Sequence, residues 1–272
     1  MATDTAVRTA EGPTLEDVIG DASFLAGAPR RFLMEIALTP VGLGVADHSR
    51  ALRDPVGRFR NTTAYIYLVA FGTPNERRAV IRMVNRAHGP VRSAEGDAVA
   101  YNAFDPELQL WVAGCMYYGG RDMWQRMFGP MDDAAAERLY EQFQTYGTSL
   151  QVPAELWPED RAAYDAYVAR TLDGIELDPR VADYGHRLLD PASRPLPVRP
   201  VFRLLRFCTV GLLPDALRDA YGFPWSPRDQ RRFDAIMRAS SAVYRRLPRA
   251  ARELPKAMLL SASRRRVMGA QV

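Results

Sequence analysis

The chain of 272 residues has very few of the side chains that build covalently linked or metal-linked scaffolds. Its two cysteines, Cys115 and Cys208, lie far apart in the sequence and form no CxxC pair. This argues against a disulfide framework and a structural zinc site, and it predicts two free thiols. Histidine is almost as scarce, since only His48, His88 and His186 are present. Any chemistry that needs an imidazole must use one of these three.

Lysine is nearly absent, because Lys256 is the only lysine among 36 basic residues. Arginine suits bidentate binding of carboxylates and phosphates. A GC-rich genome also explains the excess of arginine, and we favour that explanation. The basic residues form no stripe interleaved with aromatic residues, so no nucleic-acid partner is expected. The block Arg264-Arg265-Arg266 predicts a solvated basic C-terminal tail over residues 263–272.

Long apolar runs are missing too. The longest candidate, Tyr65 to Phe71, is far shorter than the ~20 residues that cross a bilayer. The N-terminus has neither the basic start nor the apolar core of a secretory signal. We therefore expect a cytoplasmic protein without a transmembrane segment, beginning with a disordered N-terminus over residues 1–12.

What the sequence has in plenty is helix signals. Thr73-Pro74, Asp105-Pro106 and Ser226-Pro227 each pair a capping side chain with a proline at the first helical position. Strand patterns are nearly absent, apart from one short hairpin over 92–101. The prediction is an all-α fold: a single large helical domain over residues 13–262 with about ten or more helices. Helices are expected over 14–27, 30–46, 55–71, 73–88, 106–127, 132–147, 158–173, 179–189, 200–207, 214–221, 227–246 and 249–262.

The proline-rich stretch over 190–200 permits two interpretations. It is either a bridge between two lobes or a rigid connection across one core, and we prefer the second.

The expected helix over 55–71 carries Arg58, Thr62 and Tyr65 at helical spacing, so these side chains share one face. Arginine on an otherwise apolar helix is costly to bury unless it is paired. The alternative is an amphipathic edge on which Arg58 is solvated.

The next helix places His88 on the same face as Val80 and Val84, one residue before a glycine stop. Two interpretations stand side by side. A protonated His88 would stabilise the C-terminus of its own helix. A neutral imidazole that points into an apolar cavity would be a good axial ligand for heme iron.

A series of short motifs in fixed order favours the second interpretation. The chain resembles the family of bacterial and fungal heme oxygenases that contains the rubber oxygenase (latex-clearing protein) catalytic domain and a mycophenolic-acid-pathway oxygenase. The resemblance covers roughly residues 30–255. It rests on these segments: Gly44-Val45-Ala46-Asp47-His48-Ser49, Asp54-Pro55, Gly57-Arg58, Thr62, Phe71-Gly72, His88-Gly89-Pro90-Val91, Asp105-Pro106-Glu107-Leu108, Leu110-Trp111-Val112, Gly211-Leu212-Leu213-Pro214, Leu217-Arg218, Tyr221-Gly222 and Trp225.

The resemblance implies a b-type heme in a globin-like helical packing. The family's His-x-x-Val element would make His88 the proximal iron ligand, with Arg58 and Thr62 lining the heme pocket and supporting activity. Tyr65 is a candidate neighbour because it shares their face. The implied function is a heme b-dependent oxygenase or oxidase that uses O2 as co-substrate on an apolar small molecule, such as a secondary metabolite, a terpenoid or a lipid.

The chain also departs from the family at several polar positions. Leu38 stands where an Ala-His-Pro histidine is common, Ala113 where a second histidine follows Leu-Trp-Val, Tyr118 where an aspartate is common, and Phe104 replaces an asparagine. Asn61 replaces a lysine that reaches the iron in rubber oxygenases. The resemblance therefore implies an open distal side.

Two alternatives follow. One is a diverged, heme-free member that binds or cyclises an apolar metabolite. The other is non-heme iron held by Asp47, His48 and His88. His186 looks like a surface residue.

Overall fold

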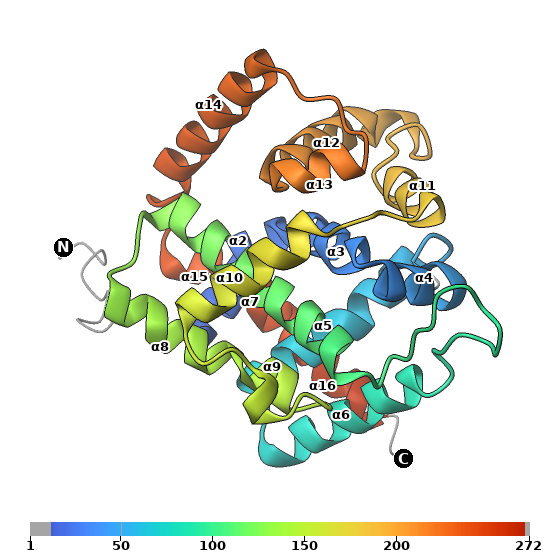
Figure 1. Cartoon of the computed structure of the whole chain (residues 1–272). Helices are drawn as coiled ribbons and strands as arrows, with labels where there is room; N and C mark the ends of the chain where they lie inside the picture. Colours follow the sequence, from blue (N-terminus) through green and yellow to red (C-terminus); the bar gives the residue numbers. More distant parts are fainter. Residues whose placement is uncertain (1–11, 50, 270–272) are drawn as a thin grey trace.

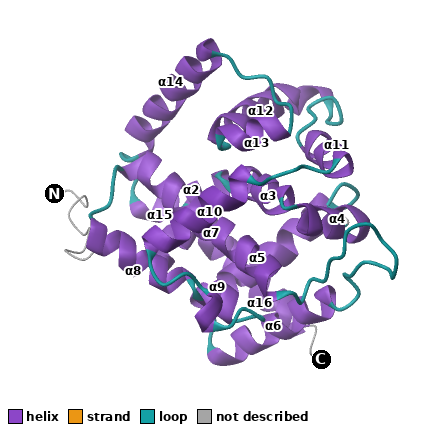
Figure 2. Ribbon diagram, viewed as in Figure 1, coloured by secondary structure: helices purple, strands orange, loops and turns teal. Residues whose placement is uncertain are grey.

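The computed structural model describes residues 12–49 and 51–269 and confirms the all-α prediction (Figures 1 and 2). It forms a single helical domain. The hairpin over 92–101 is reduced to one antiparallel bridge between Arg92 and Asn102. The helices are α1 (Leu15–Gly20), α2 (Ala22–Ala26), α3 (Ala28–Ala37), α4 (Thr39–His48), α5 (Pro55–Phe71), α6 (Pro74–His88), α7 (Pro106–Phe128), α8 (Asp133–Phe143), α9 (Thr145–Thr148), α10 (Arg161–Asp173), α11 (Pro179–Leu188), α12 (Arg199–Leu212), α13 (Asp215–Ala220), α14 (Pro227–Tyr244), α15 (Arg249–Arg252) and α16 (Leu254–Gly269), with short 3-10 turns η1 (Ala154–Leu156) and η2 (Leu196–Val198).

The three predicted capped starts are all present. Thr73 and Glu76 form the capping box that begins α6, and Ser226 closes a second box at α14. The Asp105 side chain accepts the backbone N–H groups of Glu107 and Leu108 at α7. These side chains satisfy amide groups that the first helical turn leaves free, which fixes where each helix starts.

Helix α7 is the centre of the fold and packs against α1, α2, α3, α8, α9 and α14. Its Trp111 and Tyr117 are fully buried. Gly114 lets α10 approach closely, and the Tyr164 hydroxyl donates to the Gly114 carbonyl at 2.8 Å. A Cβ at Gly119 would overlap the Arg31 side chain of α3. Small residues on α7 therefore set the spacing of the core.

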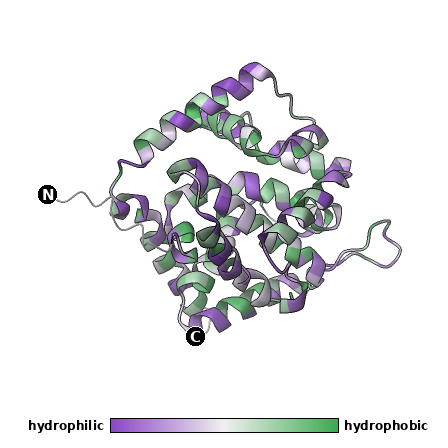
Figure 3. Ribbon diagram, turned by 60° about the vertical axis from the view of Figure 1, so that its left-hand side comes forward, coloured by the Kyte–Doolittle hydropathy of each residue, from purple (hydrophilic) through white to green (hydrophobic). Residues whose placement is uncertain are grey.

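Figure 3 shows green and purple residues alternating along most of the helices. This is the pattern expected when each helix buries one face and exposes the other. No helix in the described ranges is long and apolar enough to span a bilayer.

The C-terminal helix differs from the solvated basic tail expected over 263–272. Helix α16 continues to Gly269 and packs against α5 and α6, with Ser263 and Val267 buried. Arg264 pairs with Glu76 of α6 at 3.0 Å. Residues 263–269 are thus part of the packed helical domain. Ser263 and Val267 lie four residues apart, so they share the face of α16 that is buried, while the arginines between them point elsewhere. The disordered N-terminus expected over 1–12 lies, apart from Gly12, outside the described residues.

The proline-rich stretch over 190–200 connects α11 to α12 within the single domain, through the turn η2. The preferred interpretation, a rigid connection over one core, is consistent with this path. Cys115 and Cys208 are both free, as predicted.

Candidate functional site

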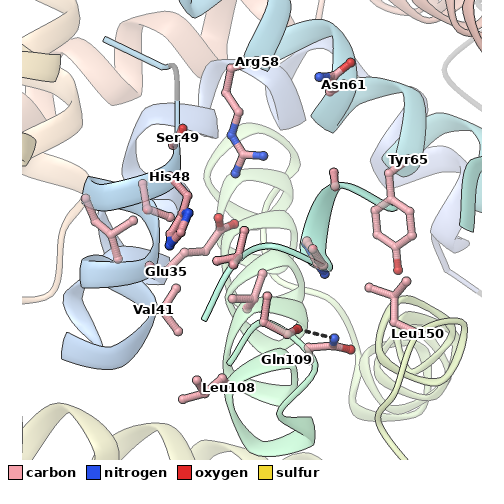
Figure 4. Close-up of a pocket in the computed structure, with 18 of the residues that line it drawn as sticks. Glu35, Val41, His48, Ser49, Arg58, Asn61, Tyr65, Leu108, Gln109 and Leu150 are labelled. Carbon is pink, nitrogen blue, oxygen red and sulfur yellow. Dashed lines mark hydrogen bonds between the residues drawn. The ribbon is translucent and has the colours of Figure 1, made fainter. Parts of the chain in front are cut away.

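A cavity of about 560 Å³ lies between the α3–α4 region, α5, the end of α6, the loop after it and α7. Its size is within the roughly 300–1,000 Å³ usual for small-molecule and cofactor sites. Figure 4 shows Glu35, Val41 and His48 on one side, Arg58 and Tyr65 of α5 on another, and Leu108 and Gln109 of α7 below them. Segments far apart in the sequence therefore meet at one cavity.

His88 lies on the cavity wall at the last residue of α6, held there by the Thr73–Glu76 cap and a C-cap at Gly89. Its Nδ1 is buried and has no hydrogen-bond partner among the described residues. Burial lowers the pKa of His88, and the positive charge of Arg58 lowers it further. The imidazole is therefore neutral at pH 7, which is the form that binds a metal.

Arg58 also lines the cavity, as the sequence predicts, and is partly buried. Its guanidinium makes no hydrogen bond or ion pair with another described residue. In Figure 4 it reaches from α5 toward Glu35 and His48. An unpaired guanidinium on a cavity wall can bind a carboxylate or stabilise developing negative charge.

Glu35 is a cavity residue that sequence reasoning missed. Burial raises the pKa of this carboxyl group from 4.5 to about 7, although Arg58 and Arg31 oppose the rise. A group poised near neutral pH can both hold and release a proton. The signal in the sequence is that Glu35 is the only charged residue between Arg31 and Asp47.

The structure separates Thr62 from the other predicted site residues. Tyr65 lines the cavity, and its hydroxyl donates to the Tyr146 carbonyl at 2.5 Å. Thr62 is exposed and does not line the cavity; Asn61 does. On a helix, residues at the spacing of Arg58, Asn61 and Tyr65 point to the same side. Thr62 follows Asn61 directly, so its side chain points in a different direction from that of Asn61. The C-terminal helix closes this wall, because Arg266 donates to Asn61 at 2.9 Å.

A chain of amides begins at Gln109 on the cavity wall. Gln109 on α7 donates to Gln151 at 2.5 Å and receives the backbone N–H of Gln151 at 2.9 Å. Gln151 donates in turn to Asn85 of α6 at 3.1 Å. These bonds fix α6 relative to α7, and thereby the position of the His88 end of α6.

The second cavity histidine, His48, has a different environment. The Tyr101 hydroxyl donates to Asp47 at 3.0 Å and lies 3.3 Å from Nε2 of His48, which fastens the loop after α6 to the end of α4. No cluster of three metal-binding side chains exists in the described part of the chain. Asp47, His48 and His88 thus do not form the three-ligand group that the non-heme iron alternative requires.

His186 is not the surface residue that its sequence context suggests. It is half-buried, its Nε2 lies 2.7 Å from the Tyr221 carbonyl, and its ring packs on Phe223 with centroids 4.6 Å apart. Residues 221–223 cover the His186 ring. They lie far from His186 in the sequence, so its local context could not predict this contact.

The residues that depart from the family motifs divide between the cavity and the core. Ala113 lines the cavity. Phe104 packs edge-on against His88 with ring centroids 6.4 Å apart. Leu38 and Tyr118 pack against the hydrophobic core. Ala113 and Phe104 therefore place apolar groups on the cavity wall and beside His88, while Leu38 and Tyr118 belong to the core.

The fold and this cavity define a class: an all-helical protein with a cavity lined by a neutral histidine and by an arginine that has no ion-pair partner among the described residues. Comparison with known families identifies the class. The model of the family described as "ER-bound oxygenase mpaB/B'/Rubber oxygenase, catalytic domain" matches residues 17–242. The chain belongs to this family, which is a family of oxygenases and supports an enzymatic role. Helix α16, with Arg266, lies beyond the matched residues.

Two similar relatives are "Uncharacterized protein Mb2261" of Mycobacterium bovis and "Uncharacterized protein Rv2237" of Mycobacterium tuberculosis. Each is 37% identical over 223 residues, which cover 79% of this chain and 87% of the relative. No solved structure matches the chain.

Proposed function

We propose that the chain is a heme b-dependent oxygenase, with His88 as the proximal iron ligand, O2 as co-substrate and an apolar small molecule as substrate. The observation that carries the proposal is the buried, unpartnered Nδ1 of a neutral His88 on the wall of a cavity, in a member of an oxygenase family. An orphaned ring nitrogen at such a place is costly unless a ligand or metal satisfies it.

The donors of the cavity fit a b-type heme in two respects. His88 supplies an imidazole of the form that iron binds. Arg58 and Arg266 line the same cavity and would pair with the propionate carboxylates. Apolar side chains such as Val112, Ala113 and Met116 of α7 complete the lining and suit both a porphyrin and an apolar substrate.

When bound, heme would supply the redox chemistry that dioxygen requires. The protein's own groups then have distinct tasks. Arg58 stabilises negative charge that develops in the cavity. Glu35, with a pKa of about 7, holds or releases a proton at its carboxyl oxygen. The apolar wall excludes water from the substrate.

One observation favours the heme-free alternative as a second candidate. A proximal histidine usually donates its second ring N–H to an acceptor. Neither ring nitrogen of His88 has a hydrogen-bond partner among the described residues, so the nitrogen that does not bind iron would lack an acceptor, and Phe104 packs against the ring. In that case the same cavity would bind an apolar metabolite without iron.

Titration of the purified protein with hemin separates the two candidates. The proposal predicts a saturable Soret band with one heme per chain. His88→Ala should lose the band while far-ultraviolet circular dichroism stays helical. His48→Ala is the matched control, because it removes the other cavity imidazole and should retain the band. A wild-type protein that never develops the band would refute the proposal, and loss of the band only in His48→Ala would move the ligand to His48.

A further inference from the structure

One stretch of the surface combines exposed apolar side chains with arginines and contains no acidic residue. It runs from η2 into the first half of α12. The apolar members are Leu196, Val198, Val201 and Leu204, which are 73, 39, 66 and 51% exposed. With Arg194, Arg199, Arg203 and Arg206 they form what we call the η2–α12 patch.

No ion pair among the described residues compensates the positive charge of this patch. No aspartate or glutamate occurs between Asp190 and Asp215. The ion pairs that precede and follow the patch in the sequence do not involve its arginines. They join Asp183 to Arg187 and Asp215 to Arg218. Arg199 donates only to backbone carbonyls, at 2.9 and 3.0 Å. The patch therefore offers guanidinium groups without carboxylate partners among the described residues.

Aromatic rings position two of these arginines. The Arg194 guanidinium lies 4.8 Å from the centroid of Phe202, and that of Arg206 lies 5.2 Å from the centroid of Phe223. Arg203 is exposed. Guanidinium groups beside exposed aliphatic side chains are the composition of a helix that lies in a membrane interface, where phosphates meet acyl chains.

The rest of the fold leaves this half of α12 uncovered. The C-terminal half of α12 buries Thr209, Val210 and Leu212, and the helix packs on α3 and α14. In Figure 1, α12 lies at the periphery of the molecule, beyond α3. Phe207 packs against Trp225 of the core, whereas Leu196, Val198, Val201 and Leu204 remain exposed.

Two other occupants fit the patch less well. A second copy related by a two-fold axis would set the same arginines against each other. The segment Pro195 to Pro200 resembles a proline-rich peptide ligand, but Leu196–Val198 is a 3-10 turn rather than the extended helix that aromatic grooves bind.

We propose that the η2–α12 patch docks the protein onto an anionic lipid surface, with Val201 and Leu204 entering the acyl boundary and the arginines binding phosphate groups. This docking is independent of heme and of the proposed oxygenase activity.

Co-sedimentation with vesicles tests the proposal. The native protein should pellet with vesicles of phosphatidylcholine mixed with phosphatidylglycerol, bind vesicles of phosphatidylcholine alone more weakly, and be released by salt. The double variant Val201→Asp, Leu204→Asp should bind at least about tenfold more weakly, since each buried aliphatic side chain contributes about that factor. Arg203→Glu should reduce binding several-fold, since it reverses one interfacial charge.

Val243→Asp on α14 is the matched control, because Val243 is 64% exposed and lies outside the patch. It should bind like the native protein. A native protein that remains in the supernatant with both kinds of vesicle overturns the proposal, as does a double variant or Arg203→Glu that pellets like the native protein. A dimer in solution that the double variant dissociates would instead identify an interface between copies. If the double variant loses its helical circular dichroism, Arg203→Glu alone decides, since it replaces only an exposed polar group.

Discussion

Replacing Glu35 with glutamine should change how the stability of the protein depends on pH. The pKa of Glu35 is raised from 4.5 to about 7, chiefly by burial. Between these values the folded protein holds a proton that the unfolded chain has released. The free energy of unfolding therefore falls as pH rises through this window and levels off above pH 7.

The magnitude follows from the size of the shift. At 1.36 kcal/mol per pKa unit, the ionised carboxylate costs the folded protein an upper bound of about 3 kcal/mol above pH 7. Glutamine has nearly the same shape and no titratable proton, so Glu35→Gln should stabilise the protein by roughly 1–3 kcal/mol at pH 8 and very little at pH 4.5. For a chain of this size the melting temperature should rise by several degrees.

The assay is thermal unfolding followed by circular dichroism from below pH 5 to above pH 8. Glu159→Gln, at an exposed glutamate before α10, is the matched control and should parallel the native protein. Curves for Glu35→Gln and the native protein that stay parallel across this range would refute the argument that burial raises the pKa of Glu35.

Three further predictions follow from contacts in the structure. Arg58→Ala should change hemin binding or turnover while altering the free energy of unfolding by no more than about 0.5 kcal/mol, because Arg58 has no hydrogen-bond or ion-pair partner among the described residues. Thr62→Ala, at an exposed position one helical turn away, should leave both properties unchanged; equal effects of the two variants on turnover would return Thr62 to the site. Gly119→Ala should lower stability by about 1–3 kcal/mol in denaturant unfolding, because its Cβ would overlap Arg31; an unchanged midpoint would show that α3 and α7 can separate freely. Thiol titration of denatured, unreduced protein should find both cysteines, and finding none would mean that they are oxidised.

The helices could be predicted from sequence because their start signals are local. Thr73, Asp105 and Ser226 begin α6, α7 and α14 through bonds to residues two or three positions away. The end of α16 could not be predicted in this way. Ser263 and Val267 are buried by contact with distant helices, whereas the sequence around them shows mainly arginines.

The candidate site could be predicted only in part, for a geometrical reason. Spacing puts Arg58, Thr62 and Tyr65 within one sector of a helix, but it does not say which edge of that sector faces a cavity. Both Asn61 and Thr62 are exposed, but the packing of α5 places only Asn61 on the cavity wall. Glu35 belongs to the site because α3 and α5 line the same cavity, and no motif links residues so far apart in the sequence.

The most direct test of the central claim is chemical rescue of the proposed ligand. His88→Gly should lose the Soret band that hemin gives with the native protein, and added imidazole should restore it by occupying the space of the missing side chain. An undiminished band in His88→Gly, or a native protein that binds no heme at all, would contradict the assignment of His88 to the iron.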